Sequence, residues 1–208
     1  MRGVFKQIGG ILVLMSGVMT LPLLVSLAYQ EYYTVLGLAA TSLITLTIGF
    51  SLFKGIGNAP ELTNKHALIT AAAGWLSLAL VGAFPFYLTA LFTPASEAAG
   101  FVPDGAAYTS SLYNFTNPLH ALFESMSAYT TTGLTMAVHE PSIGKGLLFY
   151  RSLAQWIGGV GFIVLSLAIL RQSPSQRTMQ FSGSDYTGEK LKPNIIGTAR
   201  AIWQIYLG

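Results

Sequence analysis

The sequence contains no cysteine and little charge, and each shortage excludes a class of protein. Without cysteine, the 208-residue chain has no disulfide, no thiolate nucleophile and no cysteine-bound metal. Only 9% of its residues are charged, against about 25% in an ordinary soluble domain, while 52% are hydrophobic. This composition predicts a protein whose solvent is the lipid bilayer. The net charge of +3 therefore gives no indication of nucleic-acid binding.

Four long apolar segments dominate the chain: residues 8–29, 34–53, 66–92 and 146–170. A helix rises about 1.5 Å per residue, so each segment is long enough to cross a hydrocarbon core of about 30 Å. Pro22 and Pro85 fall inside two of these segments, and we expect them to bend their helices. The first segment exceeds the apolar region of a secretory signal and a second follows at once, so we expect it to be retained.

The positions of the basic residues predict the orientation. With four crossings, nine of the eleven Lys and Arg residues fall on one side of the membrane: Arg2, Lys6, Lys54, Lys65, Arg171, Arg177, Lys190, Lys192 and Arg200. That side should be cytoplasmic by the positive-inside rule. The opposite side receives Glu31, Glu97, Asp104 and Glu140, with only Lys145. The sequence thus predicts a multi-pass protein of the plasma (inner) membrane with a cytoplasmic N-terminus.

Between the third and fourth segments lies a stretch that differs from a simple connection. Residues 93–117 are polar and contain glycine, which predicts an exposed loop. Asn117-Pro118 then suits a helix start, because Asn can cap free N–H groups and Pro fits the first helical position. The apolar segment 118–129 is too short to cross the membrane and predicts a re-entrant helix.

The hexapeptide 130–135, Thr-Thr-Thr-Gly-Leu-Thr, follows this short segment and is expected to be extended. In lipid, such backbone survives only where it is buried in protein or lines a water-filled cavity. A short helix followed by a Thr/Gly strand is the layout of a cation filter, in which carbonyl oxygens replace the hydration shell of the ion. An ordinary extracellular turn could have the same six residues, but the position between two spans favours the filter.

Glu124 and Arg151 are the ionisable residues nearest to this filter. Glu124 could attract cations, but we favour a structural carboxylate that binds neighbouring backbone N–H groups or Arg151. Arg151 is expected to extend outward or to pair with Glu124. The glycine run 158–161 predicts close helix packing. The three histidines, His66, His120 and His139, lack the spacing of metal ligands.

Residues 123–135 (FESMSAYTTTGLT) and 148–161 (LFYRSLAQWIGGVG) resemble the first repeat of the Trk/Ktr/HKT superfamily of potassium transporters. The two leading helices are similar to the additional N-terminal pair of the Trk branch. Residues 191–207 resemble the approach to a second repeat and turn apolar again, so we expect another membrane helix to begin there and the chain to stop before the pore is complete.

The resemblance implies an all-α membrane protein with two leading transmembrane helices and one helix–pore loop–helix repeat. The domains would be residues 1–60 for the leading pair, 61–172 for the repeat, and 173–208 for a cytoplasmic linker and the start of the next repeat. In the superfamily, four such repeats surround one potassium pathway. The pathway would be lined here by backbone carbonyls of Thr131, Thr132, Gly133 and Leu134, with potassium at Thr131 and Thr132.

The resemblance also implies the substrate and partners. Sodium-preferring plant relatives have Ser where this chain has Gly133, so Gly favours potassium uptake, with no cofactor in this chain. We expect the remaining pore repeats, a homodimer and a cytosolic nucleotide-binding regulatory subunit as partners. Two alternatives are a non-conducting structural or assembly fragment and an intramembrane hydrolase that uses Glu124 or His120. The hydrolase is disfavoured because no H-E-x-x-H, G-x-S-x-G or paired-aspartate pattern occurs, so we expect no enzyme.

Overall fold

The computed structural model describes residues 1–57, 64–170 and 204, and every secondary-structure element in these residues is helical. In chain order the helices are α1 Arg2–Val18, α2 Thr20–Ala28, α3 Tyr32–Gly55, α4 Asn64–Gly82, α5 Phe84–Phe92, α6 Ala95–Ala99, η1 Ser111–Thr116, α7 Pro118–Tyr129, η2 Glu140–Ile143 and α8 Lys145–Leu170. The chain divides into two compact units, Met1–Trp156 and Ile157–Gly208. The predicted boundary at residues 60 and 61 lies outside the described part, as does the helix predicted to begin within residues 191–207, except for Gln204.

The predicted all-α membrane architecture is confirmed. Among the described residues, three stretches are long and apolar enough to cross a membrane: Arg2–Ala28, Tyr32–Gly55 and Ile69–Phe92. They coincide with the first three predicted spans. The fourth predicted span coincides with α8, whose 26 residues correspond to a length of about 39 Å.

The first and third spans are each interrupted just before a proline. The break between α1 and α2 falls at Met19, and the break between α4 and α5 falls at Ala83. Pro22 and Pro85 have no N–H to donate to the carbonyl four residues earlier, and their rings crowd that carbonyl. Each proline thus distorts its helix, as predicted, and the distortion takes the form of a local interruption.

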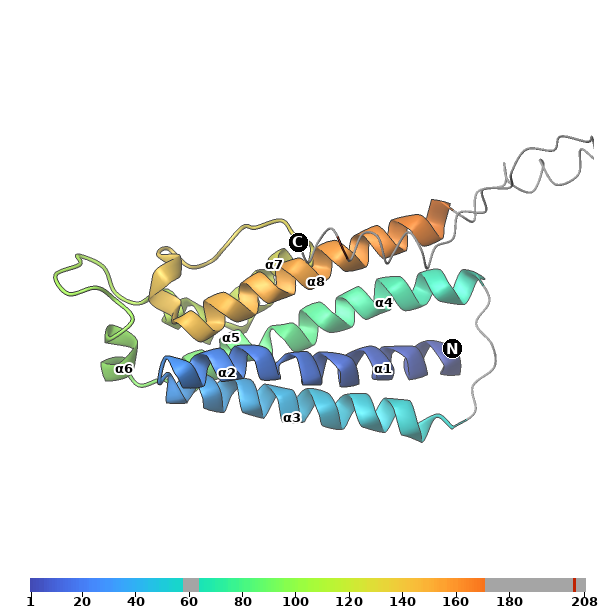
Figure 1. Cartoon of the computed structure of the whole chain (residues 1–208), viewed down its shortest axis with the longest axis horizontal. Coiled ribbons are helices and arrows are strands. Elements are labelled where there is room, and N and C mark those ends of the chain that lie inside the picture. Colours follow the sequence, from blue (N-terminus) through green and yellow to red (C-terminus); the bar gives the residue numbers. More distant parts are fainter. Residues whose placement is uncertain (58–63, 171–203, 205–208) are drawn as a thin grey trace, which may run out of the picture. The chain divides into compact units, whose positions relative to one another are not determined.

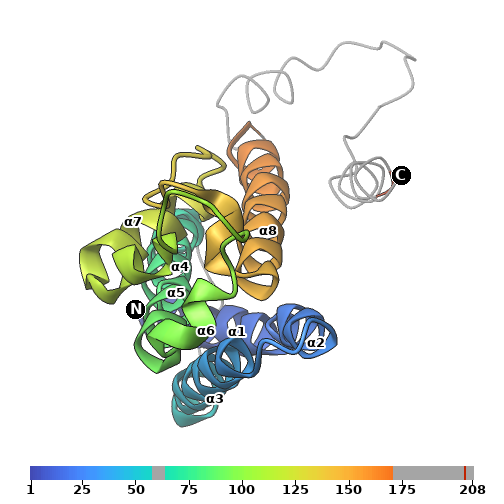
Figure 2. The same cartoon turned by 90° about the vertical axis from the view of Figure 1, so that its left-hand side faces the viewer.

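The N-terminal hairpin, defined here as α1, α2 and α3, is closely packed. The α1–α2 span runs antiparallel to α3, which contacts both helices (Figures 1 and 2). A Cβ atom on Gly9 would lie 2.8 Å from the carbonyl oxygen of Gly49, and one on Gly49 would lie 3.0 Å from the carbonyl oxygen of Gly9. Small residues thus let the two backbones touch, as is common between membrane helices.

The core of the first unit joins this hairpin to the segments around α7. At its centre is Phe86 of α5, which is fully buried, with ring-centroid distances of 5.1 Å to Phe115 and 5.3 Å to Tyr150. Leu112 and Phe115 of η1 are also fully buried. The prediction that residues 93–117 form an exposed connection is therefore wrong for η1. Tertiary packing orders this segment, although its sequence is polar and contains glycine.

Candidate functional site

Helix α7 begins where the sequence predicted and is too short to cross a membrane. The Asn117 side-chain oxygen Oδ1 accepts a hydrogen bond from the Leu119 N–H at 3.0 Å, and Pro118 is the first helical residue. Both features are typical of helix N-termini. Its 12 residues extend only about 18 Å, so the helix can enter a bilayer of about 30 Å but cannot span it.

The C-terminus of α7 closes in a tight turn formed by the threonines. The Thr131 N–H donates to the Ala128 carbonyl, and the Thr132 N–H donates to the Ser127 carbonyl, both at 3.0 Å. This pair of bonds is a Schellman motif, which requires a left-handed residue just after the helix. Thr131 takes that position with a φ of +57°. The expectation that the whole hexapeptide is extended is therefore wrong for Thr130 and Thr131, which form the turn.

The backbone beyond this turn is accessible. Residues 130–134, here called the filter turn, are all exposed, and Thr132 to Thr135 have no helix or strand pattern. Gly133 has a φ of +80°, and a Cβ atom built on it would meet nothing within 4 Å. Glycine adopts this left-handed conformation without strain. The turn thus presents backbone to open space at the end of a short helix.

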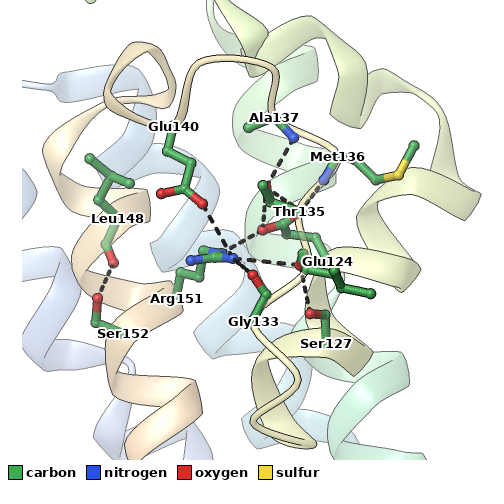
Figure 3. A network of polar contacts seen from close by, with 11 residues as sticks. Glu124, Ser127, Gly133, Thr135, Met136, Ala137, Glu140, Leu148, Arg151 and Ser152 are labelled. Carbon is green, nitrogen blue, oxygen red and sulfur yellow. Dashed lines mark hydrogen bonds and ion pairs between the residues drawn. The ribbon is translucent and has the colours of Figure 1, made fainter.

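Behind the filter turn, Glu124 is fully buried in a network of hydrogen bonds (Figure 3). Its carboxylate accepts bonds from the Thr135 hydroxyl at 3.0 Å and from the Met136 N–H at 2.8 Å. Arg151 Nε donates to Glu124 Oε1 at 2.6 Å. Both kinds of partner expected for a structural carboxylate, a backbone N–H group and Arg151, are present. The charge of a buried carboxylate with these partners is compensated.

Arg151 connects this network to the filter turn (Figure 3). Its Nη2 donates to the Gly133 carbonyl at 3.0 Å, reaches the Leu134 carbonyl at 3.5 Å and lies 3.6 Å from Glu140 Oε1. The Leu134 carbonyl also accepts a bond of 2.6 Å from the Ser127 hydroxyl. Of the two outcomes expected for Arg151, pairing with Glu124 is the one observed.

The four carbonyls predicted to line an ion pathway therefore fall into two pairs. Those of Gly133 and Leu134 accept hydrogen bonds from Arg151 and Ser127. Within the part of the chain that the structure describes, no hydrogen bond reaches the carbonyl of Thr131 or Thr132. A carbonyl oxygen that accepts no hydrogen bond has both of its lone pairs free to coordinate an ion. The second pair is thus the one available to a ligand.

Sequence reasoning missed several residues that hold α7 in place. The Trp75 Nε1 of α4 donates to the Tyr129 carbonyl at 3.2 Å. The hydroxyls of Tyr129 and Tyr150 lie 3.3 Å apart, and the Tyr150 hydroxyl donates to the Gly82 carbonyl at 3.0 Å. No spacing in the sequence identifies these pairs, because they join helices far apart along the chain.

His120 and His139 contact residues outside the filter turn. His120 Nδ1 lies 2.9 Å from the Asn114 carbonyl, and the His139 ring stacks on Tyr108 at 3.7 Å. His66 lies in α4. In residues 1–57 and 64–170, no group of three or more histidine or acidic side chains is arranged to hold a metal ion. The close packing predicted for residues 158–161 stays a prediction.

Sequence comparisons relate the chain to known transport proteins. A family model described as TrkH, cation transport protein, matches residues 61–208. An uncharacterized cation transporter of Methanocaldococcus jannaschii is 32% identical over 206 residues, which cover 99% of this chain and 38% of that protein. The Trk system potassium uptake protein TrkH of Salmonella typhimurium is 32% identical over 216 residues, which cover 99% of this chain and 39% of that protein.

A solved structure also matches nearly the whole chain. The crystal structure of the potassium transporter TrkH from Vibrio parahaemolyticus superimposes with a TM-score of 0.68 at 28% sequence identity, covering 99% of this chain and 36% of the other. The chain therefore spans less than two-fifths of the length of these relatives.

Proposed function

The chain belongs to the TrkH family of cation transport proteins, and we propose that it supplies one filter segment of a potassium-conducting pore in the plasma membrane. This family consists of transporters and not of enzymes. The observation that carries the proposal is the pair of unbonded carbonyls, those of Thr131 and Thr132, on an exposed turn at the end of a short helix.

The chemistry of this turn suits an alkali cation. Carbonyl oxygens can replace the hydration shell of potassium, and no bond has to be made or broken. The negative end of the α7 dipole lies at the same turn, which favours a cation over an anion. Potassium is thus the substrate of this site, held by backbone oxygens of Thr131 and Thr132.

The residues behind the turn orient the filter backbone and do not contact the ion. Arg151 and Ser127 fix the carbonyls of Gly133 and Leu134, and Glu124 fixes Arg151. Because these side chains hold the following carbonyls, the backbone of Thr131 and Thr132 is left in a defined orientation. The fixed carbonyls of Gly133 and Leu134 thus set the shape of the filter, while those of Thr131 and Thr132 contact the ion.

The proposal requires further parts. A single filter turn is present in the described residues, so an ion pathway needs additional filter segments around the same axis. By resemblance to the superfamily, we propose three further pore repeats, a homodimer and a cytosolic nucleotide-binding regulatory subunit. The basic residues predicted at the cytoplasmic side would face that subunit. Without these further segments, a single filter turn would not conduct.

Replacement of Gly133 by Ser tests the proposal. Serine adds a side chain beside the filter carbonyls and resists a φ of +80°, so the ion-facing backbone should shift. In liposomes with a conducting pore that contains this chain, we expect the potassium-to-sodium flux ratio to fall by about tenfold, which corresponds to about 1.4 kcal/mol of discrimination.

Gly105 provides a matched control for this substitution. It has a φ of +81° and, like Gly133, open space where a Cβ atom would be. Gly105→Ser therefore introduces the same backbone strain in the loop before η1, away from the filter turn. It should leave the flux ratio unchanged. If Gly133→Ser also leaves the ratio unchanged while the pore conducts, the assignment of the filter is wrong.

A further inference from the structure

The turn between α2 and α3 contacts the start of α8 through one carboxylate. Glu31 Oε1 accepts a hydrogen bond from the Lys145 N–H at 2.5 Å, and Oε2 accepts one from the Gly146 N–H at 3.0 Å. These are the first two N–H groups of α8, which have no carbonyl partner inside the helix. A carboxylate there also interacts favourably with the positive end of the helix dipole. Glu31 thus caps a helix that begins 114 residues later.

The surroundings of this cap are closely fitted. Gly144 has a φ of +93°, and a Cβ atom on it would lie 3.1 Å from Glu31 Oε2. A Cβ atom on Gly146 would meet the Ser26 hydroxyl and lie 3.0 Å from Thr34 Cγ2. Ser26 and Thr34 are fully buried. Glycines at these two positions therefore allow the N-terminal hairpin to touch the start of α8.

Six residues beyond Lys145, α8 carries Arg151. This separation is about 9 Å along a rigid helix, so a displacement at the start of α8 also displaces Arg151. The Arg151 side chain is only 11% exposed and is held by Glu124 at 2.6 Å, while its Nη2 bonds the Gly133 carbonyl. The contacts give the arginine little freedom to compensate. A displacement at Glu31 would therefore shift α8, then Arg151, and with it the Gly133 carbonyl.

We infer that Glu31 is a positioning residue for the filter turn, and that the N-terminal hairpin is the support against which α8 and Arg151 are set. The effect on ion selectivity rests on the proposed function, whereas the mechanical connection does not. The inference gives the leading helix pair, which precedes the residues matched by the family model, a role in filter geometry.

Hydrogen exchange in the 208-residue chain, reconstituted in lipid bilayers, tests the mechanical connection. Glu31→Gln removes the charge and one of the two acceptors. We expect exchange at Lys145 and Gly146 to rise about fivefold, the loss of roughly one net hydrogen bond, with a smaller rise at Thr131 and Thr132. Faster exchange confined to α8, with Thr131 and Thr132 unchanged, would overturn the inference.

Two further variants separate positioning from general destabilisation. Lys145→Pro removes only the first donor, at a position where proline fits a helix, and should give a smaller change in the same direction. Glu97→Gln changes an acidic residue of α6 on the same predicted side of the membrane, whose side chain makes no hydrogen bond or ion pair with the described residues. It should change exchange at none of these amides, and a change equal to that of Glu31→Gln would overturn the inference.

Ion selectivity provides the second measurement, in a conducting pore that contains this chain. A purely structural loss would lower potassium and sodium flux together, because fewer pores would be folded. Displacement of the filter should instead lower the potassium-to-sodium flux ratio of Glu31→Gln about threefold, and an unchanged ratio would overturn the role in selectivity. If the unsubstituted pore does not prefer potassium, the proposed function fails, while an exchange change at Thr131 and Thr132 still supports the mechanical connection.

Discussion

At the scale of single residues, Thr131 is the most strained position described at the site. A β-branched residue with a φ of +57° is rare, since the left-handed conformation costs about 1–2 kcal/mol for residues other than glycine. Glycine is the usual choice in a Schellman motif. The Thr131 hydroxyl donates to the Thr130 carbonyl at 2.7 Å, which offsets part of this cost. Strain of this kind persists where the surrounding structure enforces it, and it clusters at functional sites.

Replacement of Thr131 by Gly should therefore stabilise the chain. Relief of the strain outweighs the added flexibility of glycine, so we expect the free energy of unfolding to rise by about 0.5–1 kcal/mol. Thermal unfolding followed by circular dichroism in detergent would measure the change. Thr132→Gly is the control, because Thr132 has no positive φ and its replacement should lower stability. If both variants lower stability equally, the left-handed turn at Thr131 is wrong.

The limits of sequence prediction are also seen at this scale. The sequence identified Glu124 and Arg151 as neighbours of the filter and included their pairing among the expected outcomes. It did not predict that Arg151 would bond the Gly133 carbonyl, or Ser127 the Leu134 carbonyl. The direction of a carbonyl depends on the backbone angles around it, and two positive φ values within three residues cannot be derived from residue types alone.

At the scale of elements, α4 holds the end of α7 through Gly82. A Cβ atom on this glycine would lie 2.5 Å from the Tyr129 ring and 2.6 Å from the Ser125 hydroxyl. The Gly82 carbonyl also accepts the bond from Tyr150 of α8. Three helices thus meet at a position where no side chain fits.

Gly82→Ala should loosen this junction. Overpacking of a buried contact costs about 1–3 kcal/mol, because neighbouring side chains or backbones must move. We expect unfolding of the purified chain, titrated with a denaturing detergent, to shift to lower concentration. Gly17→Ala in α1 is the control, because a Cβ atom there would meet nothing within 4 Å and alanine favours a helix. Equal shifts in both variants would contradict the close contact at Gly82.

Element prediction succeeded where hydropathy and capping signals are local. The apolar segments and the Asn117-Pro118 start correspond to observed helices. The short helices α6, η1 and η2 were not predicted, and η1 shows why. The Ser110 hydroxyl bonds the Ser142 carbonyl, and the Ser111 N–H bonds the Ser142 hydroxyl. Contacts between residues about thirty positions apart thus order a segment whose composition is typical of a loop.

At the scale of the whole molecule, the two ends of the N-terminal hairpin differ in charge as the orientation prediction requires. Lys6 Nζ donates to the Gly57 carbonyl at 2.7 Å and lies 5.7 Å from the Phe53 ring centre, while Lys54 lies 4.9 Å from that of Phe50. Lysine heads beside aromatic rings at helix ends are typical of a membrane interface. The opposite end has the Glu31 cap. A cytoplasmic N-terminus and a filter turn reached from the outer side stay predictions.

The central claim is that the backbone at Thr132 lines a potassium pathway, and the absence of native cysteine makes a direct test available. Thr132→Cys, in a conducting pore that contains this chain, can be labelled with a membrane-impermeant thiol reagent. Asp104→Cys, in the loop predicted to lie outside, is the control. We predict labelling of both from outside only, with the rate at residue 132 falling about tenfold when potassium is at ten times its half-saturating concentration. Sodium should protect less, and residue 104 should be unaffected. A rate at residue 132 that ignores potassium, or equal protection at residue 104, would contradict the account.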